Sequence, residues 1–128
     1  MHIEAFFDPA TSSNTFLVFD ADRTRCVIVD SVLDYDPQAA RIRTDNADRL
    51  VRRVADTGAR VEWILETHVH ADHLSAAAYL KEKLGGRTAI GRQVVVVQDV
   101  FGKLFNAGPG FATDGSQFDH LLADGETI

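Results

Sequence analysis

The sequence has few cysteines, no excess of positive charge and no long apolar run, and each of these absences excludes a class of protein. The single cysteine, Cys26, excludes an internal disulfide framework and suits a reducing compartment. A formal net charge of −6 argues against nucleic acid as the main partner, because neutralising phosphates requires a basic surface. No apolar run has the length of a membrane span and the N-terminus carries no targeting signal, so we expect a cytoplasmic protein without a membrane partner.

The rest of the composition is that of an ordinary globular chain. Its 128 residues suit one domain, and with 45% hydrophobic and 25% charged residues it has enough apolar surface for a core. No repeat, low-complexity segment or linker divides it. Cys26 lies in the apolar run Cys26–Val29, where we expect it to be a small buried hydrophobic residue and not a nucleophile.

The most informative segment is Thr67–His73, which reads THVHADH and holds three of the five histidines. It follows a strand-like apolar run over 61–65 and precedes a helix-like run over 74–80. Imidazole nitrogens and carboxylates are the groups that zinc, iron(II) and manganese take from proteins. The candidate metal ligands are therefore His68, His70, Asp72 and His73.

The spacing of these residues has a geometric reason. Side chains alternate faces on an extended segment, so His68 and His70 project from the same side. Asp72 continues the two-residue step as the chain turns, and His73 opens the expected helix and leans back toward the same space. One turn can therefore bring four ligand groups together, whereas idle, solvated histidines would have no reason to cluster in this way.

These residues carry a resemblance to a known family. The segment Thr67–His73, placed after an apolar strand, resembles the metal motif of the metallo-β-lactamase fold superfamily. The longer run Leu65–Ser75 is similar to a branch that holds the glyoxalase II-like hydrolases and the persulfide dioxygenases. Ser13–Val18 resembles the family's early strand, and Cys26–Asp30 resembles its strand that ends in an aspartate.

The resemblance covers nearly the whole chain. Phe101–Asn106 and Leu121–Thr127 look most like the persulfide dioxygenases. The fold that it implies is α/β, namely the N-terminal half of an αββα sandwich with a mixed β-sheet. Residues 1–128 would then be a partial domain, without the second half of the sandwich.

The later ligands of the family have no counterpart in residues 1–128. These ligands are a histidine after a strand of the second half, a bridging aspartate and a final histidine. His120 is the only histidine downstream of the cluster, and it lacks the context of strand followed by turn. We expect His120 to be a surface or strand-edge residue.

The two branches imply different roles for the same residues. In the hydrolases two zinc ions are implied, with His68 and His70 on the first and Asp72 and His73 on the second. Asp72, if left free of metal, would act as a general base or as a group that orients water. In the persulfide dioxygenases a single Fe(II) is implied, with His68 as a direct ligand and the other three groups around it.

Three functions follow as hypotheses. The first is a sulfur dioxygenase acting on glutathione persulfide or a similar persulfide. The second is a glyoxalase II-like thioester metallohydrolase. The third is a non-catalytic fragment or metal-binding module. We expect the chain alone to be inactive, and to associate with another copy or with its missing half because half a sandwich leaves apolar surface uncovered.

Local patterns predict the order of the elements. Strands are expected over 2–7, 14–20, 25–31, 61–67, 87–91 and 118–123, with an irregular polar stretch over 32–43. Helices are expected over 46–57 and 73–84, the first with Asp45 as its N-cap and Gly58 at its end. Residues 94–106 combine strand-like composition with helical spacing, and we favour a helix.

Overall fold

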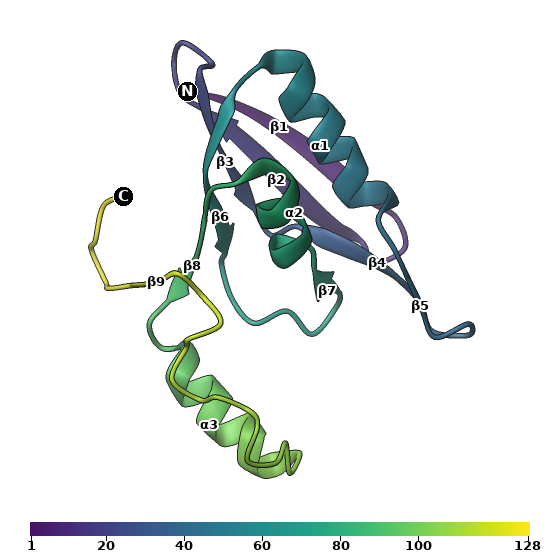
Figure 1. Ribbon diagram of the computed structural model, residues 1–128, viewed down its shortest axis with the longest axis vertical. Coiled ribbons are helices and arrows are strands. Elements are labelled where there is room, and N and C mark those ends of the chain that lie inside the picture. Colours follow the sequence, from purple (N-terminus) through teal and green to yellow (C-terminus); the bar gives the residue numbers. More distant parts are fainter.

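A computed structural model describes all residues, 1–128, and shows a mixed β-sheet with helices (Figure 1). The elements follow in the order β1 (His2–Asp8), β2 (Ser13–Phe19), β3 (Arg25–Val29), β4 (Val32–Asp36), β5 (Arg41–Arg43), α1 (Asp45–Thr57), β6 (Arg60–Glu66), β7 (Leu74–Ser75), α2 (Ala77–Leu84), β8 (Arg87–Gly91), α3 (Val94–Leu104) and β9 (His120–Leu122). The α/β class and the mixed sheet expected from the sequence are confirmed.

The main sheet has six strands in the order β1-β2-β3-β6-β8-β9. The first three strands are antiparallel neighbours, and β3, β6, β8 and β9 run parallel. Parallel neighbours need a crossover connection, and α1, α2 and α3 lie in these connections. The carboxyl ends of the parallel strands consequently meet at one edge of the sheet.

The hydrophobic core lies between one face of the sheet and the helices α1 and α2 (Figure 1). Alternate residues of β2 and β3, such as Leu17, Phe19 and Ile28, point to this face and are almost fully buried. The helices contribute residues at helical spacing, among them Leu50, Val54 and Leu80. Cys26 belongs to the same core at 2% exposure, and burial raises the pKa of its thiol to about 11, as expected for an inert side chain.

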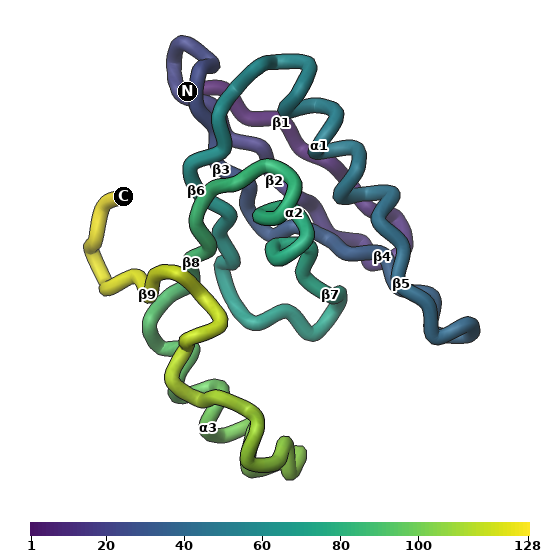
Figure 2. Tube along the Cα trace, viewed as in Figure 1, coloured from purple at the N-terminus to yellow at the C-terminus, as the bar shows by residue number.

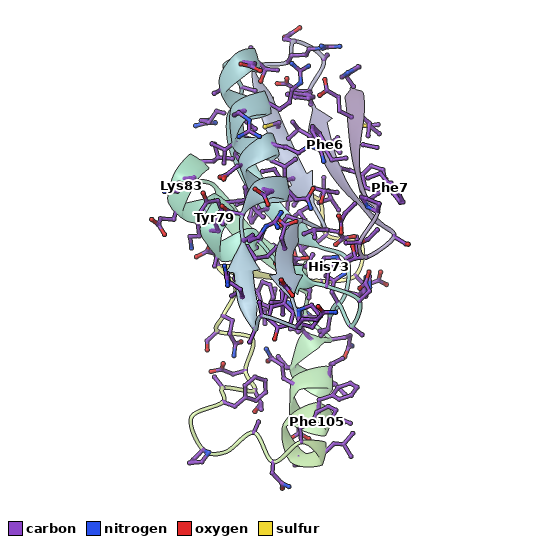
Figure 3. The ribbon with its side chains drawn as sticks, turned by 90° about the vertical axis from the view of Figure 1, so that its right-hand side faces the viewer. Phe6, Phe7, His73, Tyr79, Lys83 and Phe105 are labelled. Carbon is purple, nitrogen blue, oxygen red and sulfur yellow. The ribbon has the colours of Figure 1, made fainter.

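The opposite face of the sheet carries exposed apolar side chains. Ile3 is 51% exposed, Phe7 is 53% exposed and Phe16 is 37% exposed. Phe7 lies on the side of the sheet away from α1 (Figure 3). This face is therefore uncovered in the chain as described.

The helix α3 extends away from the body of the molecule (Figure 2). The expectation of a helix over 94–106 is confirmed, with its end at Leu104. Only Val94 and Gln98 of this helix are buried. The Gln98 side chain accepts a hydrogen bond from the backbone N–H of Gly115 at 3.0 Å and donates one to Gln117 at 2.9 Å, which ties the following loop to the helix. None of the helices has the length and apolar character needed to cross a membrane.

The expectation of an irregular stretch over 32–43 is wrong, because this stretch contains β4 and β5. They pair with each other in antiparallel fashion, and β4 also pairs with β7. The strand β7 in turn corrects the expected helix over 73–84, which begins only at Ala77. Leu74 and Ser75 pair with Leu33 and Val32, so they are extended and cannot open the helix.

The start of α1 also differs from expectation. Thr44 occupies the N-cap position, and Asp45 is the first helical residue. Asp34 of β4 accepts the backbone N–H of Asn46 at 2.9 Å, so a carboxylate from another element satisfies a donor of the first turn. Gly58 ends the helix in the left-handed conformation at φ 67°, as expected.

Candidate metal centre

The candidate site lies at the carboxyl edge of the parallel strands. Asp30 follows β3, Glu66 ends β6, and the loop Thr67–His73 leaves β6 at the same edge. This is where open α/β sheets generally place their ligands. Asp30 has a positive φ of 53°, a conformation that aspartate tolerates better than most residues.

His70 is oriented by two carboxylates. Its Nε2 lies 3.0 Å from Oδ1 of Asp30 and 2.9 Å from Oε2 of Glu66, and only the contact with Asp30 has the alignment of a hydrogen bond. The neutral ring therefore holds its proton on Nε2. Its Nδ1 is buried, has no hydrogen-bond partner and lies 3.5 Å from Oδ1 of Asp72. That nitrogen offers a lone pair toward the centre of the cluster.

In His73 the two ring nitrogens have the opposite roles from those in His70. Its Nδ1 lies 3.0 Å from the carbonyl oxygen of Leu74, to which it donates. Its Nε2 is buried without a partner, and lies 4.0 Å from Oδ2 of Asp72. The side chain is 1% exposed, so the free nitrogen is desolvated. The rings of His70 and His73 are stacked, with 4.2 Å between their centroids. Figure 3 labels His73 and shows where this pair lies in the fold.

His68 is oriented through Thr67. The Thr67 hydroxyl donates to Oδ2 of Asp30 at 2.7 Å and lies 2.9 Å from Nδ1 of His68. A hydroxyl has one hydrogen, so it must accept from His68, and the ring proton sits on Nδ1. The Nε2 atom of His68 then carries the lone pair. The rings of His68 and His70 are 4.3 Å apart.

The structure brings the predicted residues together in two overlapping groups. His70, Asp72 and His73 have ligand atoms within 4.8 Å of one another, and so do Asp30, His68 and His70. Asp30 is a less suitable ligand than the others, because its oxygens already accept from His70 and from both the N–H and the hydroxyl of Thr67. We assign it to the support of the histidines.

The donor set fits a divalent metal ion. Two buried imidazole nitrogens without partners are costly unless an ion or a donor meets them. Imidazole with carboxylate suits zinc, iron and manganese. The residues that could hold the ion are His68, His70, Asp72 and His73, of which Asp72 and His73 share one group with His70 and His68 shares the other.

The carboxylates around the cluster differ in their ionisation. A hydrogen bond from its own backbone N–H, with a smaller contribution from His73 and His70, holds the pKa of Asp72 below its usual value. Burial raises the pKa of Asp30, but the hydrogen bonds from Thr67 and His70 outweigh it and the net pKa is lowered. Burial raises the pKa of Glu66. Asp72 and Asp30 are therefore the carboxylates that stay ionised most readily.

A cavity of about 350 Å³ adjoins the histidines. The three histidines and Glu66 line it together with apolar side chains, among them Ile90, Val94, Phe111 and Phe118. These apolar residues come from β8, α3 and the loop that Gln98 holds. A small substrate in this cavity would meet both the metal-binding groups and apolar surface.

His120 lies outside both ligand groups. It is in β9, its ring is 5.9 Å from that of Trp63, and its Nε2 is paired with Glu126 at 2.6 Å. This agrees with the strand-edge position expected for it. The functional residues that sequence patterns missed are Asp30, Thr67 and Glu66 as supports of the histidines. The one available signal was that Asp30 and Glu66 each end an apolar strand.

Comparisons with known proteins agree with this geometry. A family model described as the metallo-beta-lactamase superfamily matches residues 8–120. A probable metallo-hydrolase of Burkholderia pseudomallei is 65% identical over all of this chain, which covers 44% of that protein. Glyoxylase B2 of Dictyostelium discoideum is 42% identical over 97% of the chain, covering 43% of that protein.

More distant relatives include proteins named for a different activity. The mitochondrial persulfide dioxygenase ETHE1 of Homo sapiens is 25% identical over 98% of the chain and 38% of that protein. The crystal structure of ETHE1 from Myxococcus xanthus matches with a TM-score of 0.57 and 28% identity, over 70% of this chain and 35% of that one. The chain thus spans less than half the length of these relatives. By the match over residues 8–120, the chain belongs to the metallo-beta-lactamase superfamily.

Proposed function

We propose that this chain is the metal-binding part of a persulfide dioxygenase, an enzyme that oxidises glutathione persulfide or a similar thiol-derived substrate. The observation that carries the proposal is the pair of buried, unpartnered nitrogens, Nδ1 of His70 and Nε2 of His73, beside an apolar cavity. Together with His68 and Asp72 these atoms offer a metal site next to a substrate space.

In the proposed reaction the metal and the side chains of this chain would have different roles. A single bound Fe(II) would supply the redox chemistry that lets oxygen react with the substrate sulfur. The resemblance implies His68 as a direct ligand, and the free nitrogens of His70 and His73 would join it on the ion or orient the reacting groups. The Asp72 side chain is 47% exposed and lies beside His70 and His73, so its carboxylate is placed to accept a proton. Phe111 and Phe118 would keep water from the substrate side.

The sulfur chemistry is supported by the relatives and by the cavity. The persulfide dioxygenase of Homo sapiens is similar over 98% of this chain, and an ETHE1 structure shares 28% identity with it. A polarisable sulfur makes favourable contacts with aromatic rings. The aromatic wall of the cavity therefore suits a substrate whose reactive atom is sulfur.

Thioester hydrolysis is the second candidate. It is supported by the 42% identity with Glyoxylase B2, which exceeds the 25% identity with the persulfide dioxygenase. In this alternative one or two zinc ions would bind, with His68 and His70 on the first and Asp72 and His73 on the second. Zinc would lower the pKa of a bound water and polarise the substrate carbonyl.

The test compares both reactions on one preparation. The chain is joined to the segment that follows the matching region in the Burkholderia relative, loaded with iron(II), and given glutathione persulfide in an oxygen electrode. Oxygen uptake with little cleavage of lactoylglutathione supports the proposal. Rapid thioester cleavage without oxygen uptake, with two metal ions bound, would move the assignment to the hydrolase. Absence of both activities after verified metal loading would favour a non-catalytic metal-binding module.

The chain alone should be inactive, and it should associate with a second copy or with the rest of the sandwich. Its uncovered sheet face exposes Ile3, Phe7 and Phe16, a surface that a second copy or the rest of the sandwich would cover. Light scattering over a dilution series should show species larger than a monomer, and the variant Phe7→Ser should reduce their fraction. A stable, cooperative monomer at low concentration would contradict this part of the proposal.

A further inference from the structure

Glu66 is a buried carboxylate beside the metal centre, and it is not one of the candidate metal ligands. The residue is 5% exposed, and its Oε2 has no hydrogen-bond partner. This oxygen nevertheless lies 2.9 Å from Nε2 of His70, on the far side of the ring from the free Nδ1. Leaving a buried carboxylate oxygen without a hydrogen bond costs free energy. Other contacts of the Glu66 side chain must therefore keep this oxygen next to His70.

Three elements fix the direction of the Glu66 side chain. Its other oxygen, Oε1, accepts a hydrogen bond from the hydroxyl of Ser75 in β7. The Ser75 hydroxyl oxygen accepts in turn from the backbone N–H of Ala77, the first residue of α2, at 3.0 Å. Ser75 is itself paired with Val32 of β4. The carboxylate is therefore clamped at one oxygen and directed at His70 with the other.

The arrangement surrounds one ring N–H with two carboxylates. Asp30 accepts the proton at 3.0 Å, and Glu66 stands beside it at 2.9 Å. Negative charge next to the N–H of an imidazole makes the opposite nitrogen a stronger electron donor, and contacts of this kind also fix the ring in one orientation. Both effects act on Nδ1, the atom that faces Asp72.

We propose that Glu66 is a positioning residue of the metal centre, which with Asp30 sets the orientation of His70 and strengthens the binding of a divalent ion through its Nδ1. This inference rests on the metal centre of the proposed function. It requires that the ion meets Nδ1 of His70, the buried nitrogen without a hydrogen-bond partner, and it makes no assumption about the reaction that the ion then serves. The competing explanation is that Glu66 only anchors Ser75 and the start of α2.

The variant Glu66→Gln separates these two roles. It keeps the side-chain volume and an oxygen that can accept from Ser75. It removes the negative charge and turns an amide N–H toward the N–H of His70. If Glu66 is only a structural anchor, the substitution should change thermal stability alone. If Glu66 is a positioning residue, the substitution should also change the metal affinity and the electronic spectrum of the bound metal.

The experiment measures the affinity of the 128-residue chain for Zn(II) and Co(II) by competition with a chromophoric chelator, together with the visible spectrum of the Co(II) form. Glu66→Gln should bind both ions about 10–100-fold more weakly and shift the Co(II) bands. The matched control is Glu126→Gln, which removes a carboxylate from His120, an imidazole outside the cluster. It should leave affinity and spectrum unchanged.

Each result decides the matter. A folded Glu66→Gln chain with the affinity and spectrum of the parent overturns the inference, and so does an equal loss in Glu126→Gln. Should Glu66→Gln fail to fold, Ser75→Ala takes its place, because it frees the carboxylate without removing it. Weaker binding in Ser75→Ala then supports the inference, and unchanged binding overturns it. If the parent chain binds neither ion, the metal centre itself is wrong. If the parent binds and Glu66→Gln binds equally well, only the role given to Glu66 is wrong.

Discussion

Oδ1 of Asp30 lies 3.0 Å from Nε2 of His70, and Oδ2 of the same residue accepts the hydroxyl of Thr67. One carboxylate at the end of β3 therefore sets the proton positions of two histidines, directly for His70 and through Thr67 for His68. In both rings the nitrogen left with a lone pair is the one available to a metal.

Replacing Asp30 should disturb both rings. In Asp30→Asn the amide N–H takes the place of the oxygen that accepts from Thr67, so the hydroxyl would donate to His68 and push its proton onto Nε2. We expect affinity for Zn(II) to fall about 10–100-fold in a chelator competition. The control Asp22→Asn, in an exposed turn, should bind as the parent does. Equal affinities of the Asp30→Asn and parent chains would contradict the orienting role.

Metal content should separate the cluster from the isolated histidine. His68→Ala should retain less metal than His120→Ala after identical purification, because His68 belongs to a ligand group and His120 is paired with Glu126. Elemental analysis of the two variants and the parent provides the measurement. Equal loss in both variants, or no loss in either, would show that the assignment of ligands is wrong.

The ion pair of Glu4 with Arg53 should make stability depend on pH. Hydrogen bonding to Arg53, at 2.7 and 2.6 Å, lowers the pKa of Glu4 from 4.5 to about 2. The carboxylate therefore stabilises the fold above its unfolded pKa, and this contribution disappears as pH falls from 4.5 to about 2.

The variant Glu4→Gln isolates this contribution. At neutral pH it should lower the free energy of unfolding by about 1 kcal/mol, since the pair is partly exposed. The difference from the parent should shrink through the acidic range given above. Glu82→Gln, at an exposed site, is the control. A difference that stays constant down to the lowest pH would argue against the ion pair, and urea unfolding at several pH values measures it.

Two helical leucines should respond differently to truncation. Leu80 of α2 is 0% exposed in the core, and Leu104 of α3 is 66% exposed. Leu80→Ala should cost about 2–5 kcal/mol because it leaves a cavity. Leu104→Ala should change stability by less than about 0.5 kcal/mol. Comparable shifts in the urea midpoint would mean that α3 packs against something in solution.

The parts of the fold that could be predicted are those with local signals. Apolar alternation identified β1 and β2, helical spacing identified α1 and α3, and Gly58 marked the end of α1. The strand β7 could not be predicted, because its pairing with β4 joins residues more than forty positions apart. The hairpin of β4 and β5 is local, but the polar sequence of this stretch does not indicate strands. The cap that Asp34 gives to α1 likewise comes from another element.

The site divides in the same way. His68, His70, Asp72 and His73 stand in one short segment, so spacing alone identified them. Asp30 reaches His70 across forty positions, and its place after an apolar strand does not indicate which residue it contacts. Glu66 is adjacent to the segment, but its burial and its clamp by Ser75 appear only in the folded chain. Sequence patterns thus identify candidate ligands, whereas the residues that orient them depend on tertiary contacts.

The central claim, a metal centre in the loop after β6, has a direct test in a crystal of this chain soaked with Zn(II). An anomalous difference map collected at the zinc edge should show a peak at coordination distance, about 2.0–2.2 Å, from Nδ1 of His70 and from a second group among His68, Asp72 and His73. A well-ordered loop without such a peak, or a peak bound elsewhere while the cluster stays empty, would contradict the account.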